Sequence, residues 1–349
     1  MTALWDFPDF DAHEAVHLFH DEKSGLTAVI ALHSTTLGPG AGGTRFWHYA
    51  DKSHAITDAL RLSRGMSYKN AMAGLPLGGG KGVILANETR EKTPEILAAY
   101  GRAIESLGGN YVTAEDVGIS DADMVQIAKQ TKYVSGLPVK DSADAGGDPG
   151  PFTAHGVYLG VKASVEQKLG RSSMKDVHVA IQGIGSVGGG LAKLLAADGA
   201  KLSIADINKD RVAAFASELG ANVVGLDEIM RIEADVFSPN ALGAVLDKVS
   251  IANLNAPIVA GGANNQLATP SDGQRIFDRD ILWAPDYVIN AGGIINVGLE
   301  YLGSGDVDAV NARIAKIPSR LKSIWDESAA SKLPSSTVSD KMAQKLIGR

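Results

Sequence analysis

Apolar residues in the first part of the chain recur at two different spacings. Val16–His20 and Leu26–His33 are β-rich runs, and residues 21–25 between them have the composition of a turn. This pattern predicts an antiparallel hairpin. From Ser53 the apolar positions shift to a helical period, which predicts a helix that ends near Lys69.

Capping residues place two more helices in this part of the chain. Thr93 followed by Pro94 combines a good N-cap with proline at the first helical position. Ser120 and Asp123 have the spacing of a capping box for a third helix. Asp116 precedes that helix, so we expect it on a strand-to-helix loop.

The second part of the chain alternates short apolar strands with helices. Residues 135–151 are rich in Gly, Pro, Asp and Ser, which indicates a hinge or linker, and a helix is expected from about Thr153 to Leu169. Ala309–Trp325 and Val338–Ile347 have the pattern of amphipathic helices. Near-continuous apolar strands separated by helices predict a doubly wound parallel sheet with both faces covered. The expected strands are Val177–Gln182, Lys201–Asp206, Asn222–Val224, Asp235–Ser238, Pro257–Ala260 and Tyr287–Asn290.

Composition and charge exclude several classes of protein. The 33 Lys and Arg residues against 40 Asp and Glu give a net charge of −7, which argues against a nucleic-acid-binding chain. No run approaches the roughly 20 apolar residues that cross a bilayer, and residues 1–11 lack the layout of a secretion signal, so a cytoplasmic location and no membrane partner are expected. The absence of cysteine removes disulfides, thiolate nucleophiles and cysteine-based metal sites.

Glycine is the unusual component, with 40 residues in a chain of 349, where the usual level of roughly 7% would give about 24. Gly183-Ile184-Gly185-Ser186-Val187-Gly188 follows the strand Val177–Gln182 and opens a helix, and Asp206 ends the next strand about 20 residues on. This arrangement predicts a Rossmann dinucleotide site, with the pyrophosphate at the helix N-terminus and the ribose at the carboxylate. Ile207 and Asn208 follow Asp206 without a basic residue, which favours NAD over NADP. A glycine-rich turn without a ligand is the less favoured alternative.

A second glycine cluster surrounds a lysine. Lys81 stands in the run Gly78–Gly82, directly before an expected strand at Val83–Leu85. With little side-chain cover among these glycines, we expect a ligand to fill the gap next to Lys81. A Walker phosphate loop is excluded, because Leu75 stands at its first glycine and Gly82 at its Ser or Thr. A solvated turn is the ordinary alternative.

Several motifs, in order along residues 38 to 300, together carry a resemblance to a known family. The chain resembles the amino-acid dehydrogenases that deaminate leucine, valine, phenylalanine or glutamate, and is closest to the leucine and phenylalanine branches. Besides the nucleotide glycines, the motifs are Gly38-Pro39-Gly40-Ala41-Gly42-Gly43-Thr44-Arg45, Gly65-Met66-Ser67-Tyr68-Lys69-Asn70, Leu77-Gly78-Gly79-Gly80-Lys81, Thr113-Ala114-Glu115-Asp116-Val117-Gly118, Gly261-Gly262-Ala263-Asn264-Asn265-Gln266 and Val288-Ile289-Asn290-Ala291-Gly292-Gly293.

The resemblance implies a role for each matching residue. Lys69 matches the lysine that holds the substrate α-carboxylate, with Gly42 and Gly43 supplying close backbone, while Lys81 matches the catalytic lysine and Asp116 the proton-shuttling acid. Desolvation and repulsion by a second lysine would lower the pKa of Lys81, so that it can activate water while Asp116 exchanges protons with the nitrogen.

The resemblance also implies the residues around the substrate and the cofactor. Asn264 matches the amide near the substrate, and the positions around the substrate side chain are all apolar, which disfavours a buried second carboxylate as in glutamate. These apolar positions are Ala41, Met66, Ala114, Ile294 and Val297. The expected cofactor contacts are Thr153, Gly183, Gly185, Ser186, Val187, Gly188, Asp206, Asn240 and Asn290.

Together these patterns predict an α/β fold with two domains and a cleft between them. Residues 1–140 would form the N-terminal substrate-binding and oligomerisation domain and residues 141–325 the Rossmann NAD-binding domain, while residues 326–349 would form a helix packed on the first domain or a neighbouring subunit. A homo-oligomer, from dimer to octamer, is implied by the resemblance.

The expected activity is reversible NAD-dependent oxidative deamination of an apolar L-amino acid, of the leucine, valine, isoleucine or phenylalanine type, to the 2-oxo acid and ammonia. Tryptophan or glutamate as substrate remains an alternative, as does a non-catalytic nucleotide-binding sensor, although a sensor has no need of Lys69, Lys81 and Asp116. No metal is expected at the histidines His13, His17 and His20, which lack a metal-binding motif.

Overall fold

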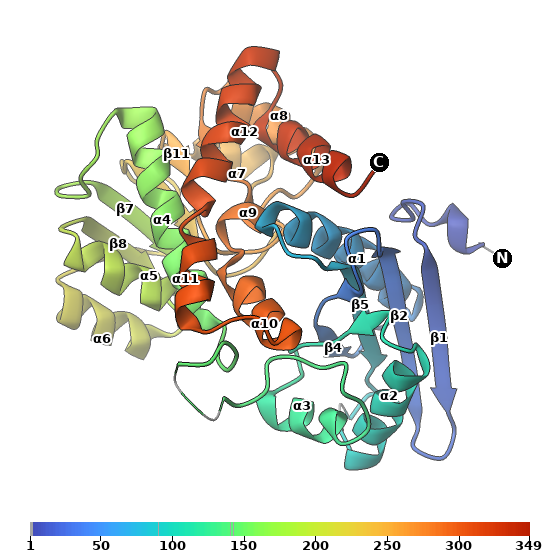
Figure 1. The fold of residues 1–349 in the computed structure, drawn as a ribbon. Helices are drawn as coiled ribbons and strands as arrows, with labels where there is room; N and C mark the ends of the chain where they lie inside the picture. The colour runs from blue at the N-terminus through green and yellow to red at the C-terminus, as the bar shows by residue number, and fades with distance from the viewer. Residues whose placement is uncertain (1–2, 90, 140, 142) are drawn as a thin grey trace. The chain divides into compact units, whose positions relative to one another are not determined.

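The computed structural model describes residues 3–89, 91–139, 141 and 143–349 (Figure 1). The chain divides into two compact units. The first comprises Met1–Asp148, Ile294–Val310 and Ala343–Arg349, and the second comprises Pro149–Gly293 and Asn311–Met342. The first unit therefore extends to Asp148, beyond the expected boundary at residue 140, and includes residues 294–310, which we expected in the second domain. Residues 326–342, which we expected outside the second domain, belong to the second unit. The predicted fold class, a two-domain α/β protein with a doubly wound second domain, is confirmed.

The first unit is built on a mixed sheet. The predicted hairpin is present, because β1 and β2 pair antiparallel, and β2 pairs antiparallel with β5 at the centre of the sheet. On its other edge β5 pairs in parallel with β3 and β4, and β3 pairs with β6. The strands are β1 (Ala15–Asp21), β2 (Leu26–Ser34), β3 (Gly40–Ala41), β4 (Thr44–Trp47), β5 (Gly78–Leu85) and β6 (Tyr111–Val112).

Helices cover this sheet and begin where their caps predict. The Thr93 side chain accepts from the backbone of Ile96 (3.2 Å), and Ser120 forms a capping box with Asp123. The long helix α1 packs on β2 and β5 and ends at Gly74, whose φ of 68° favours glycine. The helical elements are η1 (Leu4–Asp6), α1 (Ser53–Ala73), α2 (Pro94–Ser106) and α3 (Asp121–Ala128).

The glycine run that we interpreted as a ligand-facing gap is the buried central strand β5. Protein atoms, not a ligand, occupy the space that its missing side chains leave. A Cβ on Gly79 would overlap Ser67 of α1, one on Gly80 would lie 2.7 Å from the ring of Tyr111, and one on Gly82 would overlap the Tyr100 hydroxyl. The glycines thus let α1 and two aromatic side chains pack directly on the strand.

The second unit holds a sheet whose pairs are all parallel, in the order β12-β11-β10-β7-β8-β9. The strands are β7 (His178–Gln182), β8 (Lys201–Ala205), β9 (Asn222–Val223), β10 (Val236–Pro239), β11 (Ile258–Val259) and β12 (Leu282–Trp283). Figure 1 shows α4, in green, beside α5 within this unit. The helices within the unit are α4 (Gly150–Leu169), α5 (Ser186–Ala197), α6 (Lys209–Leu219), α7 (Lys248–Asn253), α8 (Pro270–Asp278), α9 (Asp286–Ile289) and α12 (Ile317–Ser331).

Two predictions for this part of the chain were wrong. The expected strand at Tyr287–Asn290 is the helix α9, and the edge strand of the sheet is Leu282–Trp283. A short, largely apolar run fits either a strand or a helix, and Pro285 with Asp286 starts a helix here. The single helix expected at Ala309–Trp325 is two helices, the second of which begins with a proline in its first turn.

Three further helices carry residues of both units: α10 (Gly292–Leu302), α11 (Val307–Ile314) and α13 (Ser335–Leu346). The end of the chain belongs to the first unit, where the Gln344 amide donates to the Tyr68 hydroxyl (3.0 Å) and Arg349 donates to the backbone carbonyl of His33 (2.8 Å). Within the described ranges, no helix is both long and apolar enough to cross a membrane.

Candidate active site

Lys81 and Asp116, the two predicted catalytic residues, meet in the first unit. Lys81 lies on the central strand β5, and Asp116 lies on the loop between β6 and α3. The Lys81 Nζ is 2.8 Å from Asp116 Oδ2, and their side chains are 6% and 25% exposed. The pair is therefore an ion pair removed from most of the solvent.

The surroundings shift both pKa values downward. Burial lowers the pKa of Lys81 and outweighs the opposing effect of Asp116, and Arg45 adds to the lowering. Burial acts to raise the pKa of Asp116, but the ammonium of Lys81 and the guanidinium of Arg45 hold it below its usual range. The cation that adds to the depression at Lys81 is thus Arg45, whereas we had expected a second lysine.

Arg45 and Asp58 extend this pair into a charged network that the sequence analysis missed. Arg45, on β4, donates from Nε to Asp116 Oδ2 (3.1 Å) and from Nη1 to Asp58 Oδ2 (2.8 Å). Asp58, on α1, also accepts from the Tyr49 hydroxyl (2.8 Å). Arg45 stood within one of the resemblance motifs, and an arginine on a core strand requires an acidic partner, but that partner is 13 residues further on with no local signal.

The residues predicted to bind the substrate carboxylate lie on the β3–β4 connection and on α1. Gly42 and Gly43 connect β3 to β4, and a Cβ on Gly42 would lie 2.9 Å from Met66 Cγ of α1. A Cβ on Gly43 would overlap the Glu115 carbonyl, so both glycines permit close backbone packing. Lys69 also belongs to α1, one turn beyond Met66.

Three of the residues that we expected around the substrate side chain lie elsewhere in the first unit. Ala114 lies on the loop after β6, and Ile294 and Val297 lie on α10. Ala114 accepts from the backbone of Thr44 (2.9 Å), which ties its loop to β4. Ile294 is half-buried and Val297 is buried. A Cβ on Gly136 would lie 3.9 Å from both Val297 Cγ1 and Glu115 Cγ, so these two side chains flank the same point.

The pKa of Glu115, next to Asp116 in sequence, is shifted in the opposite direction. Its Oε1 is buried and, among the described residues, has no hydrogen-bond partner. Burial raises the pKa of Glu115 to about 8, and the Asp121 carboxylate that hydrogen-bonds to it adds to the rise. Two successive carboxyl groups therefore differ, because Asp116 is ionised at neutral pH while Glu115 retains its proton.

The predicted nucleotide turn lies in the second unit, where the strand order reverses between β7 and β10. Gly183 follows β7 with a φ of 87°, and a Cβ there would lie 3.0 Å from the Asn240 carbonyl carbon, just after β10. A Cβ on Gly188 would overlap the Gly183 carbonyl, so the helix containing Ser186 and Val187 starts tight against the turn. Around Gly185, by contrast, a Cβ would meet nothing within 4 Å. The open side of the turn is where a pyrophosphate would bind at the α5 N-terminus.

Asp206 follows β8 and contacts this turn. Its Oδ2 accepts from the backbone of Ile184 (2.8 Å) and its Oδ1 from Asn208 (2.8 Å). Arg211, in the first turn of α6, lies 3.8 Å from Oδ2. Arg211 was not among the expected cofactor-site residues, because the preference for NAD was predicted from Ile207 and Asn208 directly after Asp206.

Amide side chains line the carboxyl ends of the strands beside the turn. Asn290 donates to Asn264 Oδ1 (2.8 Å) and to the Gly262 carbonyl (3.1 Å), while its own Oδ1 is buried and, among the described residues, unpaired. Asn240 accepts from the Gly262 backbone (2.8 Å). Thr153, on α4, donates to the Pro149 carbonyl (2.9 Å). The buried acceptor on Asn290 is suited to the carboxamide of a nicotinamide.

Comparison with known proteins identifies the family of this two-unit arrangement. The model for the Glu/Leu/Phe/Val dehydrogenase dimerisation domain matches residues 13–133, and the model for Glutamate/Leucine/Phenylalanine/Valine dehydrogenase matches residues 202–338. The chain belongs to this dehydrogenase family. This confirms the predicted resemblance and the enzyme class of amino-acid dehydrogenase. It also confirms the use of a nicotinamide cofactor, as in Rossmann dehydrogenases generally.

Relatives of known name match the chain over nearly its full length. It is 43% identical to a leucine dehydrogenase of Geobacillus stearothermophilus, covering 99% of this chain and 93% of that one. It is also 43% identical to a valine dehydrogenase of Streptomyces albus, covering 97% and 93%. Among solved structures, it is similar to an L-tryptophan dehydrogenase of Nostoc punctiforme, with a TM-score of 0.84, 38% identity and coverage of 96% and 95%.

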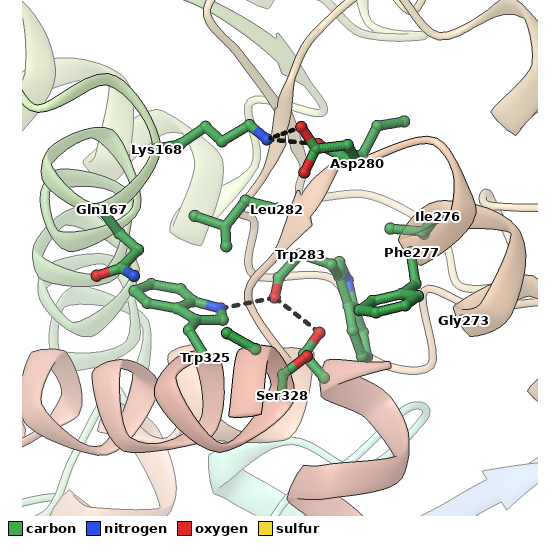
Figure 2. Close-up of a pocket in the computed structure, with 13 residues that line it drawn as sticks. Gln167, Lys168, Gly273, Ile276, Phe277, Asp280, Leu282, Trp283, Trp325 and Ser328 are labelled. Atoms are coloured by element: carbon green, nitrogen blue, oxygen red, sulfur yellow. Dashed lines mark hydrogen bonds and ion pairs between the residues drawn. The ribbon is translucent and has the colours of Figure 1, made fainter. Parts of the chain in front are cut away.

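The second unit of this dehydrogenase also contains a cavity that involves none of the predicted site residues. Most of its lining residues come from α4, α8, β12 and α12 (Figure 2). Its volume is about 330 Å³. The Trp325 indole donates to the Trp283 carbonyl (3.0 Å), and Lys168 pairs with Asp280 (2.8 Å) at its rim.

The N-terminal histidines have structural contacts in this family member. His13 is buried, with Nε2 2.9 Å from the Leu60 carbonyl and 3.1 Å from Ser63 Oγ, while His17 and His20 lie on β1. Among the described residues, no group of three or more histidine, aspartate or glutamate side chains is placed to hold a metal ion.

Proposed function

We propose that the chain catalyses reversible NAD-dependent oxidative deamination of an apolar L-amino acid. In this reaction the amino acid, NAD⁺ and water give the 2-oxo acid, ammonium, NADH and a proton. The observation that carries the proposal is the Lys81–Asp116 pair, in which a buried lysine of lowered pKa lies 2.8 Å from a carboxylate. A nucleotide-binding sensor would not require such a proton-handling pair.

The proton transfers are assigned to these two side chains. Asp116, which is ionised, accepts a proton from the substrate ammonium so that the neutral amine can be oxidised. A bound oxidised nicotinamide would supply the hydride acceptor for Cα, so that oxidation of the neutral amine gives an iminium. Lys81 in its neutral form then takes a proton from the water that attacks the iminium carbon. Asp116 returns its proton to the nitrogen of the adduct, which collapses to the 2-oxo acid and ammonia with loss of the hydroxyl proton. Lys69 holds the α-carboxylate, with Asn264 as the amide near the substrate.

The cofactor site of the second unit fits NAD better than NADP. Ser186, Val187 and the glycines of the turn would hold the pyrophosphate, Asp206 the ribose hydroxyls, and Asn290 with Asn240 and Thr153 the nicotinamide end. Two backbone hydrogen bonds hold the Asp206 carboxylate in place, so a 2′-phosphate would meet a fixed negative charge there. Arg211, at 3.8 Å, is already paired with that carboxylate and offsets only part of this repulsion.

The residues assigned to the side-chain pocket favour an aliphatic substrate. Met66, Ala114, Ile294 and Val297 offer no cation to a second carboxylate, whose burial would cost several kcal/mol. The leucine and valine dehydrogenase relatives support the same substrate class. The likeness to an L-tryptophan dehydrogenase makes tryptophan the second candidate.

A single assay tests this function. The purified protein is mixed with NAD or NADP and with leucine, valine, isoleucine, phenylalanine, tryptophan or glutamate, and reduced nicotinamide is followed by absorbance. We expect turnover with NAD and the aliphatic amino acids, and a drop in kcat of about 10²- to 10⁴-fold in Lys81→Met. NAD binding without turnover on any amino acid would favour the sensor.

We also propose that the protein assembles as a homo-oligomer through its first unit. The family model that matches residues 13–133 is described as a dimerisation domain, which supports this assignment.

A further inference from the structure

Arg45 is the cation that connects the catalytic pair to the rest of the first unit. Its Nε contacts Asp116 Oδ2 at 3.1 Å, and Lys81 Nζ contacts the same oxygen at 2.8 Å. The printed contacts of both cations therefore share one oxygen of Asp116, Oδ2. Oδ1 takes no part in these two contacts.

Arg45 is itself held from the far side of its guanidinium. Asp58 Oδ2 lies 2.8 Å from Nη1, and the Tyr49 hydroxyl donates to the same Asp58 oxygen. Arg45 is opposite Val83 in the β4–β5 register, two residues beyond Lys81, so backbone pairing sets its place relative to the lysine. The side chains of Arg45 and Asp58 are only 22% and 17% exposed, and arginine can hold two partners at once in a fixed geometry.

Arg45 also affects the charge balance at Lys81. The titratable side chains on the elements around Lys81 include Asp116 and Glu115 from the loop after β6, Arg45 from β4, and Asp58, Arg61, Arg64 and Lys69 from α1. Burial is the main cause that lowers the pKa of Lys81, Asp116 opposes it, Arg45 lowers it further and Asp58 acts to raise it. Tyr100 and Tyr111, whose hydroxyls surround Gly82, are uncharged because burial raises their pKa values.

We propose that Arg45 is a positioning residue for deamination. Anchored by Asp58, it holds Asp116 through Oδ2, so that Oδ1 serves the reacting nitrogen, and it neutralises part of the carboxylate charge that would otherwise retain the Lys81 proton. This role rests on the proposed function, because it assigns Asp116 and Lys81 to the proton transfers.

The test compares Arg45→Gln and Arg45→Lys with the unaltered protein. For Arg45→Gln we expect kcat to fall about 10- to 100-fold, because Asp116 loses its orientation, and the acid limb of the kcat/KM profile to move up by about one pH unit. Arg45→Lys retains the positive charge, so the midpoint of the acid limb should return to that of the unaltered protein. Its kcat should stay low, because the ammonium of lysine cannot hold the carboxylates of Asp116 and Asp58 together as the guanidinium of arginine does. Arg102→Gln, which removes an exposed ion pair with Asp21, is the matched control for losing a surface arginine.

An independent readout requires no turnover. The Lys81 titration is followed by NMR of protein labelled with ¹³Cε-lysine, with Lys81→Met identifying the resonance. Arg45→Gln should raise the midpoint, whereas Asp58→Asn should lower it while also reducing kcat, because an anion is lost and Arg45 loses its anchor. If the unaltered protein shows no turnover but the midpoints move in these opposite directions, the proposed function fails and the charge coupling stands.

Unchanged Lys81 titration midpoints and unchanged pH profiles in Arg45→Gln and Asp58→Asn would mean that Arg45 has only a structural role. This result would overturn the proposal. If Arg45→Gln does not fold, Asp58→Asn decides alone: a lower midpoint with reduced kcat supports the role, and unchanged values overturn it.

Discussion

Glu115→Gln provides a direct test of the electrostatics around the candidate active site. In the folded protein burial and the Asp121 carboxylate raise the pKa of Glu115 from 4.5 to about 8. Its neutral form is therefore favoured by folding, and this contribution is fully present below about pH 4.5, then is lost as the pH rises through 8. Glutamine has nearly the same shape, can donate to Asp121 and never ionises. The substitution should therefore stabilise the protein by an amount that grows between about pH 4.5 and pH 8 and is constant above pH 8.

The size of the effect follows from the shift. One pH unit of displacement corresponds to about 1.4 kcal/mol, so the whole shift would amount to about 5 kcal/mol. Because the carboxyl is only partly buried, solvent screening reduces this to about 1–2 kcal/mol. For a unit of this size such a change in the free energy of unfolding moves Tm by about 2–8 °C. Thermal unfolding of Glu115→Gln and the unaltered protein at pH 5, 7 and 9 measures it, with nearly equal Tm values expected at pH 5, most of the gap present at pH 7 and the full gap at pH 9.

Glu22→Gln, on the exposed turn of the β1–β2 hairpin, is the control for losing one negative charge. It should show a pH-independent difference from the unaltered protein. Parallel curves of Tm against pH for Glu115→Gln and the unaltered protein would refute the reasoning, because they would mean that Glu115 ionises in the folded state as it does in the unfolded chain.

Four further substitutions, the last a control for the third, test the other assignments. Lys69→Ala should raise KM for the amino acid at least tenfold with a smaller change in kcat, measured by steady-state kinetics; an unchanged KM would argue against carboxylate binding. Asp206→Ala should weaken NAD binding about tenfold by calorimetry and also lower stability by about 1–2 kcal/mol, because two backbone N–H groups lose their acceptor. Gly82→Ala should destabilise the protein by more than about 3 kcal/mol because its Cβ would overlap the Tyr100 hydroxyl, whereas Gly65→Ala, in open space on α1, should be neutral or stabilising by up to about 1 kcal/mol in denaturant unfolding.

Features with local signals could be predicted from the sequence. The hairpin, the caps at Thr93 and Ser120 and the nucleotide turn each depend on residues within a few positions of one another. The proximity of Lys81 and Asp116 came only from the resemblance, because nothing in the residues between β5 and the loop after β6 indicates that the two meet.

Features set by distant partners could not be predicted in this way. Asp58 binds Arg45 across 13 residues and two different elements, and neither residue has a local pattern that selects the other. The glycine run around Lys81 was interpreted as open to a ligand because its neighbours in space, α1 and Tyr111, are not its neighbours in sequence. Arg211 is a similar case, because the first turn of α6 brings it back to Asp206 from five positions further along the chain.

The glycines of β5 are therefore part of the chemistry at Lys81 even without contact to a ligand. Any side chain at Gly79 or Gly82 would separate the strand from α1 or from Tyr100, and water would enter beside the lysine. Burial is the largest cause of the lowered pKa of Lys81, so its reactivity depends on how closely these elements pack. A lysine in an ordinary strand, flanked by larger side chains, would reach solvent and keep its proton. The close packing removes water from Lys81, and Arg45 limits how strongly Asp116 restores the charge, so the fold and the charged network act on the same proton.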